Sequence, residues 1–361
     1  MKIIVYFNSM APAGGIERVI SRHIAFLVKN NHEVILLTKD KESSFYELPH
    51  VVKFDSLEVK MNMDMNSRIK RMFQVMVVFF SSVRILRNKI KEHRPDIIYT
   101  ATPFSLFEVY FAQFHCTNSL ATEHSSFAAY NKAYQFIAKI FYKKVGLLTV
   151  PTTLDADYYK SIGIRNTYLP NPLPFYSESR ASLDNKIVLN IGRLTNDKRH
   201  DLLINLWAQS KAKELGWKLK IIGTGENRSK IKEQIIRLNL EKSVVLRVPT
   251  KEIEQEYLSA SVFVLTSIAE GFGLVLAEAM ACGVPCVSFN CPSGPRDIID
   301  NNENGFLIEE GKNEDFIDKL DLIISNDVLR KEMGQRAKIA IRKFESQIIS
   351  KSLNELIDSK F

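Results

Sequence analysis

The fold is decided by residues 269–287, AEGFGLVLAEAMACGVPCV, in which a glycine-rich turn leads into an apolar helix and then into a strand. The turn is Glu270-Gly271-Phe272-Gly273, the helix runs from about 274 to 282, and the strand covers 286–289. Glycine lets a backbone approach a ligand closely, and the first turn of a helix has N–H groups without an intrahelical partner. The stretch therefore predicts an anion-binding turn inside an α/β domain.

Two glutamates lie eight residues apart in this stretch, Glu270 before the predicted helix and Glu278 inside it. Glu278 is an acid in the otherwise apolar segment LVLAEAMA, and burying a carboxylate without a partner is costly. We therefore expect Glu278 to meet a polar ligand or a basic group. The alternative is a solvent-exposed position on the helix.

The rest of the chain contains two successive patterns of alternating strands and helices. The first begins with a strand at 2–7, a helix at about 17–29 and a strand at 33–38, and the second begins with a strand at 187–191. Such βαβ units predict parallel sheets covered by helices. A length of 361 residues favours two domains, and three prolines at 170–174 indicate the linker. We predict one domain over 1–172, to which a last helix at about 346–361 returns, and a second over 173–345.

Candidate ligand-binding residues in the first half follow predicted strands. Gly14 and Gly15 follow the first strand, and His124 follows a strand at 119–122 together with Glu123 and Ser125. Ligands of open α/β sheets bind at this carboxyl edge. The first loop does not have the G-x-G-x-x-G pattern, which disfavours an NAD enzyme. We interpret His124 as functional, with a structural histidine as the alternative; for the glycine pair the alternative is a tight turn only.

The second half repeats this arrangement with charged residues. Arg193 and Lys198 follow the strand at 187–191, Gly223 and Gly225 follow a strand at 218–222, and Glu270 follows a strand at 262–266. Two cations, glycine turns and a helix N-terminus at one edge predict a diphosphate site. A buried carboxylate such as Glu278 is suited to accept hydrogen bonds from vicinal ribose hydroxyls.

The net charge of +8 lies entirely in the first half, where residues 1–183 contain 23 Lys or Arg and 15 Asp or Glu. A predicted helix at 66–92 carries much of it and contains MFQVMVVFF, which is too short to span a bilayer. We interpret it either as an interfacial helix on an anionic membrane or as a core helix with a basic outer face. A second aromatic and basic helix, expected at 129–144, could join that face. The neutral second half and the lack of a recognised nucleic-acid module disfavour a nucleic-acid binder.

The cysteines indicate neither disulfides nor a metal site. Cys116, Cys282, Cys286 and Cys291 have no C-x-x-C spacing and no histidine near the clustered three. We expect buried thiols in a reducing compartment. No signal peptide and no run of about 20 apolar residues is predicted, so the expected location is cytoplasmic.

These motifs resemble those of the retaining glycosyltransferases of family 4, which have the GT-B fold of two Rossmann-like domains facing across a cleft. The segment 293–297, SGPRD, is similar to bacterial capsule and lipopolysaccharide members. One departure is Glu226, which stands where the family's G-x-G-P-x-R pattern has proline, and this puts a role for Arg228 in doubt. The resemblance rests on Glu270-x7-Glu278, Gly192-Arg193-Leu194 with Lys198, Gly223-x-Gly225, Gly14-Gly15-x-Glu17-Arg18 and Glu123-His124-Ser125.

By position, the resemblance implies three sets of site residues. The cations would neutralise the leaving diphosphate, Glu270 would bind the donor sugar, and Val248 would face the base. The implied catalytic residues are His124, Arg193, Lys198 and Glu270. The implied donor-binding residues are Gly15, Arg193, Lys198, Gly223, Gly225, Val248, Glu270, Gly271, Phe272, Gly273, Leu274 and Glu278. The implied acceptor-binding residues are Gly14, Gly15, Arg18 and His124.

The resemblance implies retaining transfer of a hexose or N-acetylhexosamine from a nucleotide sugar, by preference a UDP-sugar, in cell-surface polysaccharide synthesis. The implied acceptor is a glycan or a polyprenyl-diphosphate-linked glycan at the cytoplasmic face of the inner membrane. No divalent metal is expected to be required, because the one Asp-x-Asp, Asp155-Ala156-Asp157, falls on a predicted first-domain helix. Two alternatives stay open: a nucleotide-sugar epimerase or hydrolase on the same fold, and a non-catalytic nucleotide-sugar-binding subunit.

Overall fold

The structure is a computed structural model that describes residues 1–59 and 68–361, with the side chains of 68–73 and 75 left out. Contacts divide the chain into two compact units, Met1–Pro172 with Ser346–Phe361, and Leu173–Glu345. They are called the first unit and the second unit, and each is described by itself.

The first unit is built on a seven-stranded sheet in the order β3-β2-β1-β4-β5-β6-β7, whose described strand pairs are parallel. The inner strand β1 is buried from Ile3 to Phe7, as expected for a parallel sheet with helices on both faces. The strands are β1 (Lys2–Phe7), β2 (Glu33–Thr38), β3 (Lys53–Ser56), β4 (Ile97–Thr100), β5 (Ser119–Thr122), β6 (Leu147–Val150) and β7 (Thr167–Tyr168).

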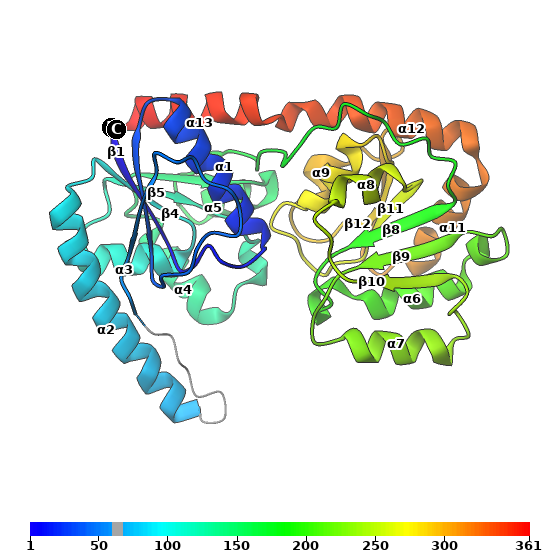
Figure 1. Cartoon of the computed structure of the whole chain (residues 1–361), viewed down its shortest axis with the longest axis horizontal. Helices are drawn as coiled ribbons and strands as arrows, with labels where there is room; N and C mark the ends of the chain where they lie inside the picture. The colour runs from blue at the N-terminus through cyan, green and yellow to red at the C-terminus, as the bar shows by residue number, and fades with distance from the viewer. Residues whose placement is uncertain (60–67) are drawn as a thin grey trace. The chain divides into compact units, whose positions relative to one another are not determined.

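Helices connect most of these strands: β1, β4, β5 and β6 each lead through a loop into a helix, whereas β2 leads to β3 without one (Figure 1). The helices of the first unit are α1 (Gly15–Lys29), α2 (Arg68–His93), α3 (Pro103–Gln113), α4 (Lys132–Phe141), α5 (Thr153–Ser161) and α13 (Ser346–Lys360), with a short 3₁₀ turn at Phe127–Ala129.

The C-terminal helix α13 packs back on the first unit beside α1, which confirms the predicted return of the chain (Figure 1). Its residues Ile349, Leu353 and Ile357 are spaced by four positions and so lie on one helix face. They are buried in a core shared with α1 and the sheet.

The second unit contains a six-stranded sheet in the order β10-β9-β8-β11-β12-β13, again with parallel pairs. Its strands are β8 (Ile187–Ile191), β9 (Lys218–Ile222), β10 (Val244–Arg247), β11 (Val262–Leu265), β12 (Cys286–Phe289) and β13 (Gly305–Ile308). Its helices are α6 (His200–Gln209), α7 (Arg228–Arg237), α8 (Ile253–Leu258), α9 (Leu274–Ala281), α10 (Pro295–Ile298), α11 (Asn313–Ser325) and α12 (Asp327–Ala340), with 3₁₀ turns at Asn196–Lys198, Lys211–Lys213 and Ile341–Phe344.

The two sheets confirm the predicted α/β class with two Rossmann-like halves. One predicted helix, at 129–144, is too long: the side chain of Asn131 caps α4 by accepting from the N–H of Tyr134, and α4 ends at Phe141. The four cysteines are buried and free, as expected. Eight predicted strands begin and end where the structure has them: 2–7, 33–38, 119–122, 187–191, 218–222, 244–247, 286–289 and 305–308.

Helix α2 is a core helix over part of its length, and the interpretation as an interfacial helix stays a prediction. The C-terminal half of α2 is part of the core, because its residues Val83, Leu86 and Ile90 are buried there. In the other half Met76 and Phe80 are 52% and 64% exposed. The predicted start at 66 and 67 lies outside the described residues. None of the helices that the structure describes is long and apolar enough to cross a membrane.

Candidate active site

Two glycine loops meet at the carboxyl edge of the second sheet, after β8 and β9. A Cβ at Gly223 would lie 1.9 Å from the carbonyl oxygen of Gly192, and a Cβ at Gly225 would lie 2.6 Å from that of Leu194. The N–H of Leu194 donates to the carbonyl of Thr224 over 2.8 Å. Gly223 and Gly225 therefore let the backbones of the two loops contact each other directly. This packing alone explains why glycine stands at both positions, without a bound ligand.

Lys198 forms an ion pair with Glu270 at this edge. Its Nζ lies 2.7 Å from Oε1 of Glu270 and 3.6 Å from Oδ2 of Asp197. The side chains of Lys198 and Glu270 are 18% and 12% exposed. Burial acts to lower the pKa of Lys198, but the carboxylates of Glu270 and Asp197 together outweigh burial, so the pKa is raised. Arg193 is exposed, and its charge acts on Lys198 and Asp197. Three predicted residues, Arg193, Lys198 and Glu270, thus lie together.

The turn that precedes α9 has the predicted form. Gly273 has a φ of 90° and stands immediately before the helix, which starts at Leu274. The N–H of Leu276 donates to the carbonyl of Gly273 over 2.9 Å, so the N–H groups of Leu274 and Val275 are the first-turn donors that can receive an anion. Phe272 is 2% exposed and packs on Phe344 with ring centroids 5.1 Å apart, so only its backbone can serve a ligand. A Cβ at Gly294 would lie 2.3 Å from the carbonyl oxygen of Phe272, so Gly294 packs directly on this turn.

Glu278 is 3% exposed, which rules out the solvent-exposed alternative. Its Oε2 accepts a 2.6 Å hydrogen bond from the hydroxyl of Tyr257 in α8. This tyrosine comes from a helix that the sequence did not predict, and the expected contact of Glu278 with a polar ligand or a basic group stays a prediction. The hydrogen bond fixes the carboxylate in the otherwise apolar interior of α9.

Two further predicted positions border the second-unit edge. Val248 follows β10 and is 63% exposed, so it can lie against a ligand. The Nη1 of Arg228 donates to the carbonyl of Gly223 over 3.2 Å. Arg228 therefore supports the glycine loop. The sequence had put a direct role of Arg228 in ligand binding in doubt, because Glu226 stands where the family pattern has proline.

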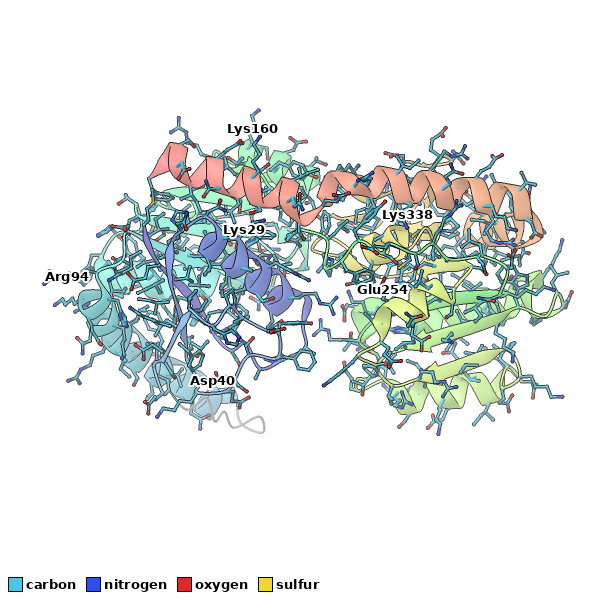
Figure 2. The ribbon with its side chains drawn as sticks, turned by 45° about the horizontal axis from the view of Figure 1, so that its top comes forward. Lys29, Asp40, Arg94, Lys160, Glu254 and Lys338 are labelled. Atoms are coloured by element: carbon cyan, nitrogen blue, oxygen red, sulfur yellow. The ribbon has the colours of Figure 1, made fainter. Side chains whose placement is uncertain are left out.

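In the first unit, Gly14, Gly15 and Arg18 lie at the N-terminus of α1. Gly14 has an extended backbone before the helix, and a Cβ there would lie 2.0 Å from Oε2 of Glu17, whose side chain folds back over its own first turn. The guanidinium of Arg18 lies 5.2 Å from the ring centroid of Tyr46. In Figure 2, Asp40, which follows β2, marks this carboxyl edge, and Lys29, the end of α1, marks the opposite one.

His124 follows β5 and is 8% exposed. Its Nε2 lies 2.8 Å from Oγ1 of Thr122, and its Nδ1 has no hydrogen-bond partner among the described residues. Burial lowers the pKa of His124 to about 4, and Asn171 acts in the opposite direction. The imidazole is therefore neutral at pH 7.

Glu123 holds the backbone of the loop that carries His124, not its ring. Its Oε1 accepts from the N–H groups of His124 over 2.9 Å and Ser125 over 3.2 Å, and from the Tyr130 hydroxyl. Its Oε2 accepts from Tyr142 over 3.0 Å and Tyr159 over 2.9 Å. Burial raises the pKa of Glu123, and these donors oppose the shift. Tyr130 and Tyr142 belong to the aromatic segment 129–144, and their hydroxyls donate to this carboxylate.

The Asp-x-Asp sequence also has a structural explanation. Asp155 lies on α5 and accepts from the N–H of Phe127 over 3.1 Å and from the Thr152 hydroxyl over 2.8 Å. It therefore fixes the segment that follows His124. Among the side chains that the structure describes, no group of three or more His, Cys, Asp or Glu could hold a metal ion.

The chain matches two family models in succession: "Glycosyltransferase Family 4" over residues 13–174 and "Glycosyl transferases group 1" over residues 175–340. It is 26% identical to the amylovoran biosynthesis glycosyltransferase AmsD of Erwinia amylovora over 99% of both chains. It is 27% identical to a Campylobacter jejuni α-1,4-N-acetyl-D-galactosaminyltransferase, named for a GalNAc-α-(1→4)-GalNAc-α-(1→3)-diNAcBac-PP-undecaprenol acceptor, over 98% of this chain and 97% of that protein.

The fold is similar to a solved structure of S. aureus TarM, a point mutant in complex with fondaparinux, α-GlcNAc-glycerol and UDP. The TM-score is 0.80 at 18% identity, and the match covers 98% of this chain and 99% of that chain. With the two parallel sheets, this likeness defines the GT-B fold. The chain belongs to the GT-B glycosyltransferases of the bacterial surface-polysaccharide type.

Sequence reasoning missed the side chains that hold His124. Thr122, Tyr99 and the tyrosines around Glu123 come from separate elements, and no local pattern joins them. One signal was present: Thr122 and His124 are two positions apart, so at the end of a strand they project to the same side.

Proposed function

We propose that this glycosyltransferase moves a hexose or N-acetylhexosamine from a nucleotide sugar, by preference a UDP-sugar, to a glycan or lipid-linked glycan, with retention of anomeric configuration. One observation carries the proposal: Arg193 and the Lys198–Glu270 pair gather at the edge where the glycine turn opens α9. Fixed cations and N–H groups stabilise the negative charge that grows on a leaving diphosphate.

In this proposal the second unit binds the donor. Arg193 and Lys198 neutralise the diphosphate, and Gly271–Leu274 offer backbone N–H groups to the phosphates and the sugar. Glu270 accepts from the donor sugar, Glu278 accepts from the ribose hydroxyls, and Val248 lies near the base. The presence of UDP in the S. aureus TarM structure supports a uridine donor.

The first unit binds the acceptor through Gly14, Gly15, Arg18 and His124 in the same proposal. The C. jejuni relative is named for a diphospho-undecaprenol-linked acceptor, which supports a lipid-linked glycan here. Transfer occurs on the front face of the sugar, assisted by the leaving phosphate. We propose that the protein's own cations suffice and that no divalent metal is required.

Contact with the cytoplasmic face of the inner membrane is the last part of the proposal. On α2, Met76, Val77 and Phe80 are 52%, 48% and 64% exposed, and residues 60–94 contain nine basic residues against Asp64 and Glu92. Apolar side chains beside basic charge suit an anionic lipid surface.

Sedimentation with anionic vesicles at low salt tests this contact. We expect the wild type to bind and a Met76→Ser/Val77→Ser/Phe80→Ser variant to bind more weakly. A Val328→Ser/Ile339→Ser variant is the control, because Val328 and Ile339 are 68% and 62% exposed on the second unit. Absence of wild-type binding, or equal loss in both variants, contradicts membrane contact through α2.

The transfer reaction is tested with a panel of UDP- and GDP-sugars and a polyprenyl-diphosphate-linked glycan. NMR of the product gives the anomeric configuration of the new linkage. We expect an α-linked product from an α-linked donor, without added metal and in the presence of a chelator. A β-linked product contradicts retention, and strict dependence on a divalent ion contradicts the metal-free mechanism. Catalytic conversion of the donor to another sugar without acceptor would instead identify an epimerase.

A further inference from the structure

The ring of His124 is one end of a buried chain of hydrogen bonds that reaches α1. Its Nε2 lies 2.8 Å from Oγ1 of Thr122, Thr122 Oγ1 donates to the Tyr99 hydroxyl over 2.7 Å, and that hydroxyl lies 3.0 Å from Nδ1 of His23. The exposed fractions of the four side chains are 8%, 2%, 0% and 3%. β5, β4 and α1 thus contribute to one dry polar chain.

The hydrogen bonds of this series run in one direction, with the donors on the side of His124 and the last acceptor on His23. Each hydroxyl has a single proton, and Thr122 gives its proton to Tyr99; the other acceptor within reach, the carbonyl of Thr100, is farther away at 3.4 Å. Thr122 must therefore accept from an Nε2–H of His124. Tyr99 in turn has its own proton left for Nδ1 of His23, which places the proton of His23 on Nε2, a buried atom without a partner among the described residues. His124 is consequently in the Nε2–H form, with a bare lone pair on Nδ1.

Both histidines are neutral, so the chain determines a tautomer and not a charge. Burial lowers the pKa of His23 to about 3 and that of His124 to about 4. Nδ1 of His124 is buried and has no hydrogen bond of normal geometry, while the buried side chain of Asn171 lies close enough to the ring to raise its pKa. A buried acceptor without a donor is unfavourable by itself, and a hydroxyl of a bound sugar would satisfy it. The backbone N–H of His124 donates to Glu123 over 2.9 Å, which holds the loop that carries the ring.

We propose that His23 is a positioning residue that holds His124, through Tyr99 and Thr122, in the Nε2–H tautomer, so that Nδ1 accepts a hydrogen bond from a substrate sugar hydroxyl. This inference rests on the proposed function, which places His124 beside substrate. His23 itself does not touch the substrate in this proposal. It acts by keeping an acceptor at the far end of the hydrogen-bond chain.

The tautomer is measured by NMR on the full chain with ¹⁵N-labelled histidine, without ligand. We expect the wild-type His124 to show a protonated Nε2 and a bare Nδ1. His23→Phe keeps the ring volume but removes the acceptor, so the direction of the chain is no longer fixed. The ratio of the two His124 tautomers should then shift by about fivefold, the equivalent of one hydrogen bond. In His23→Asn, Oδ1 can take the place of Nδ1, so the wild-type tautomer should return.

Transfer kinetics provide the functional readout. His23→Phe should lower kcat by about the same fivefold and leave the KM for the donor unchanged, and His23→Asn should recover kcat. If His23→Phe does not fold, Tyr99→Phe interrupts the same chain with its ring retained, and the same shift is expected.

Three results would overturn the inference: a protonated Nδ1 in the wild type, an unchanged tautomer in His23→Phe or Tyr99→Phe, or a folded His23→Asn as impaired as His23→Phe. The spectrum does not depend on activity. If the wild type transfers no sugar, the proposed function fails while the tautomer test still applies. If transfer is normal and the tautomer is wrong, the inference about His23 alone fails.

Discussion

Replacement of Lys198 by methionine separates its proposed role in transfer from its role in stability. The Nζ lies 2.7 Å from Glu270, and both side chains are partly exposed, at 18% and 12%. A pair with this much solvent contributes on the order of 1 kcal/mol to stability. Its proposed contact with the leaving diphosphate is worth more, because removal of one fixed donor to a developing anion costs roughly 10²- to 10³-fold in kcat.

The chain offers a matched control in the same unit. Lys220 on β9 pairs with Glu256 at 2.8 Å, and the two side chains are 21% and 26% exposed. Lys220→Met should therefore cost a similar, small amount of stability. It should leave transfer unchanged, because Lys220 lies within a strand and not in a strand-end loop.

Two measurements on each variant separate an effect on transfer from an effect on stability. These are the urea dependence of unfolding and steady-state nucleotide release in the presence of acceptor. We expect similar shifts in unfolding free energy and a large fall in kcat for Lys198→Met alone. The pKa of Lys198 is raised, so the ammonium should persist, and activity should not fall, as the pH rises to about 10. Equal kcat in the two variants would refute the role assigned to Lys198.

Three further predictions concern stability. Glu123→Gln removes a charged acceptor from five donors, so the unfolding free energy measured in urea should fall by about 2–4 kcal/mol. The control Tyr159→Phe removes one of these donors and should cost about 1 kcal/mol. Equal losses in the two variants would contradict the assigned role of the carboxylate. His23, His124 and His200 have pKa values lowered by burial to about 3, 4 and 4. The unfolded chain therefore binds more protons below pH 6.5, and each histidine should reduce the unfolding free energy by about 1.4 kcal/mol by pH 5.5; a flat profile between pH 7 and 5.5 would contradict this. Gly225 and Gly216 both have positive φ, 156° and 77°, so alanine strains the backbone at either position. Gly225→Ala also places a Cβ 2.6 Å from the carbonyl oxygen of Leu194 and should lower the unfolding free energy by about 1–3 kcal/mol, more than Gly216→Ala, whose Cβ meets nothing within 4 Å; thermal unfolding compares the two, and the reverse order would contradict the packing argument.

Predictions from the sequence succeeded where a local pattern determined the structure. The largely apolar strand at 2–7, KIIVYF, and the alternating strand at 218–222, KLKII, are flanked by polar or turn residues, so their bounds could be read directly. The strand β3 was missed because its sequence, KFDS, is polar and half exposed. The helix α8 was missed because six residues give too short a period to detect.

The same distinction applies to the site. Lys198, Glu270 and Gly273 follow neighbouring strands, so the topology of a parallel sheet brings them to one edge, and this could be predicted. The partners of Glu278 and His124 could not. Tyr257 reaches Glu278 from a helix that was not foreseen, and His23 reaches His124 across a separation of about a hundred residues. Such contacts depend on tertiary packing, which one sequence does not encode as a pattern.

Donor binding tests the central claim most directly, because the second-unit site must recognise a nucleotide sugar before any transfer occurs. Ligand-observed NMR with UDP- and GDP-sugars should be recorded for the wild type, Glu278→Gln and Glu256→Gln. Glu278→Gln keeps an oxygen that can accept from Tyr257, so the fold should be preserved. We predict selective binding of one UDP-sugar to the wild type and to Glu256→Gln, and its loss in Glu278→Gln. A folded wild type that binds no nucleotide sugar, or a Glu278→Gln variant that binds as the wild type does, would contradict the account.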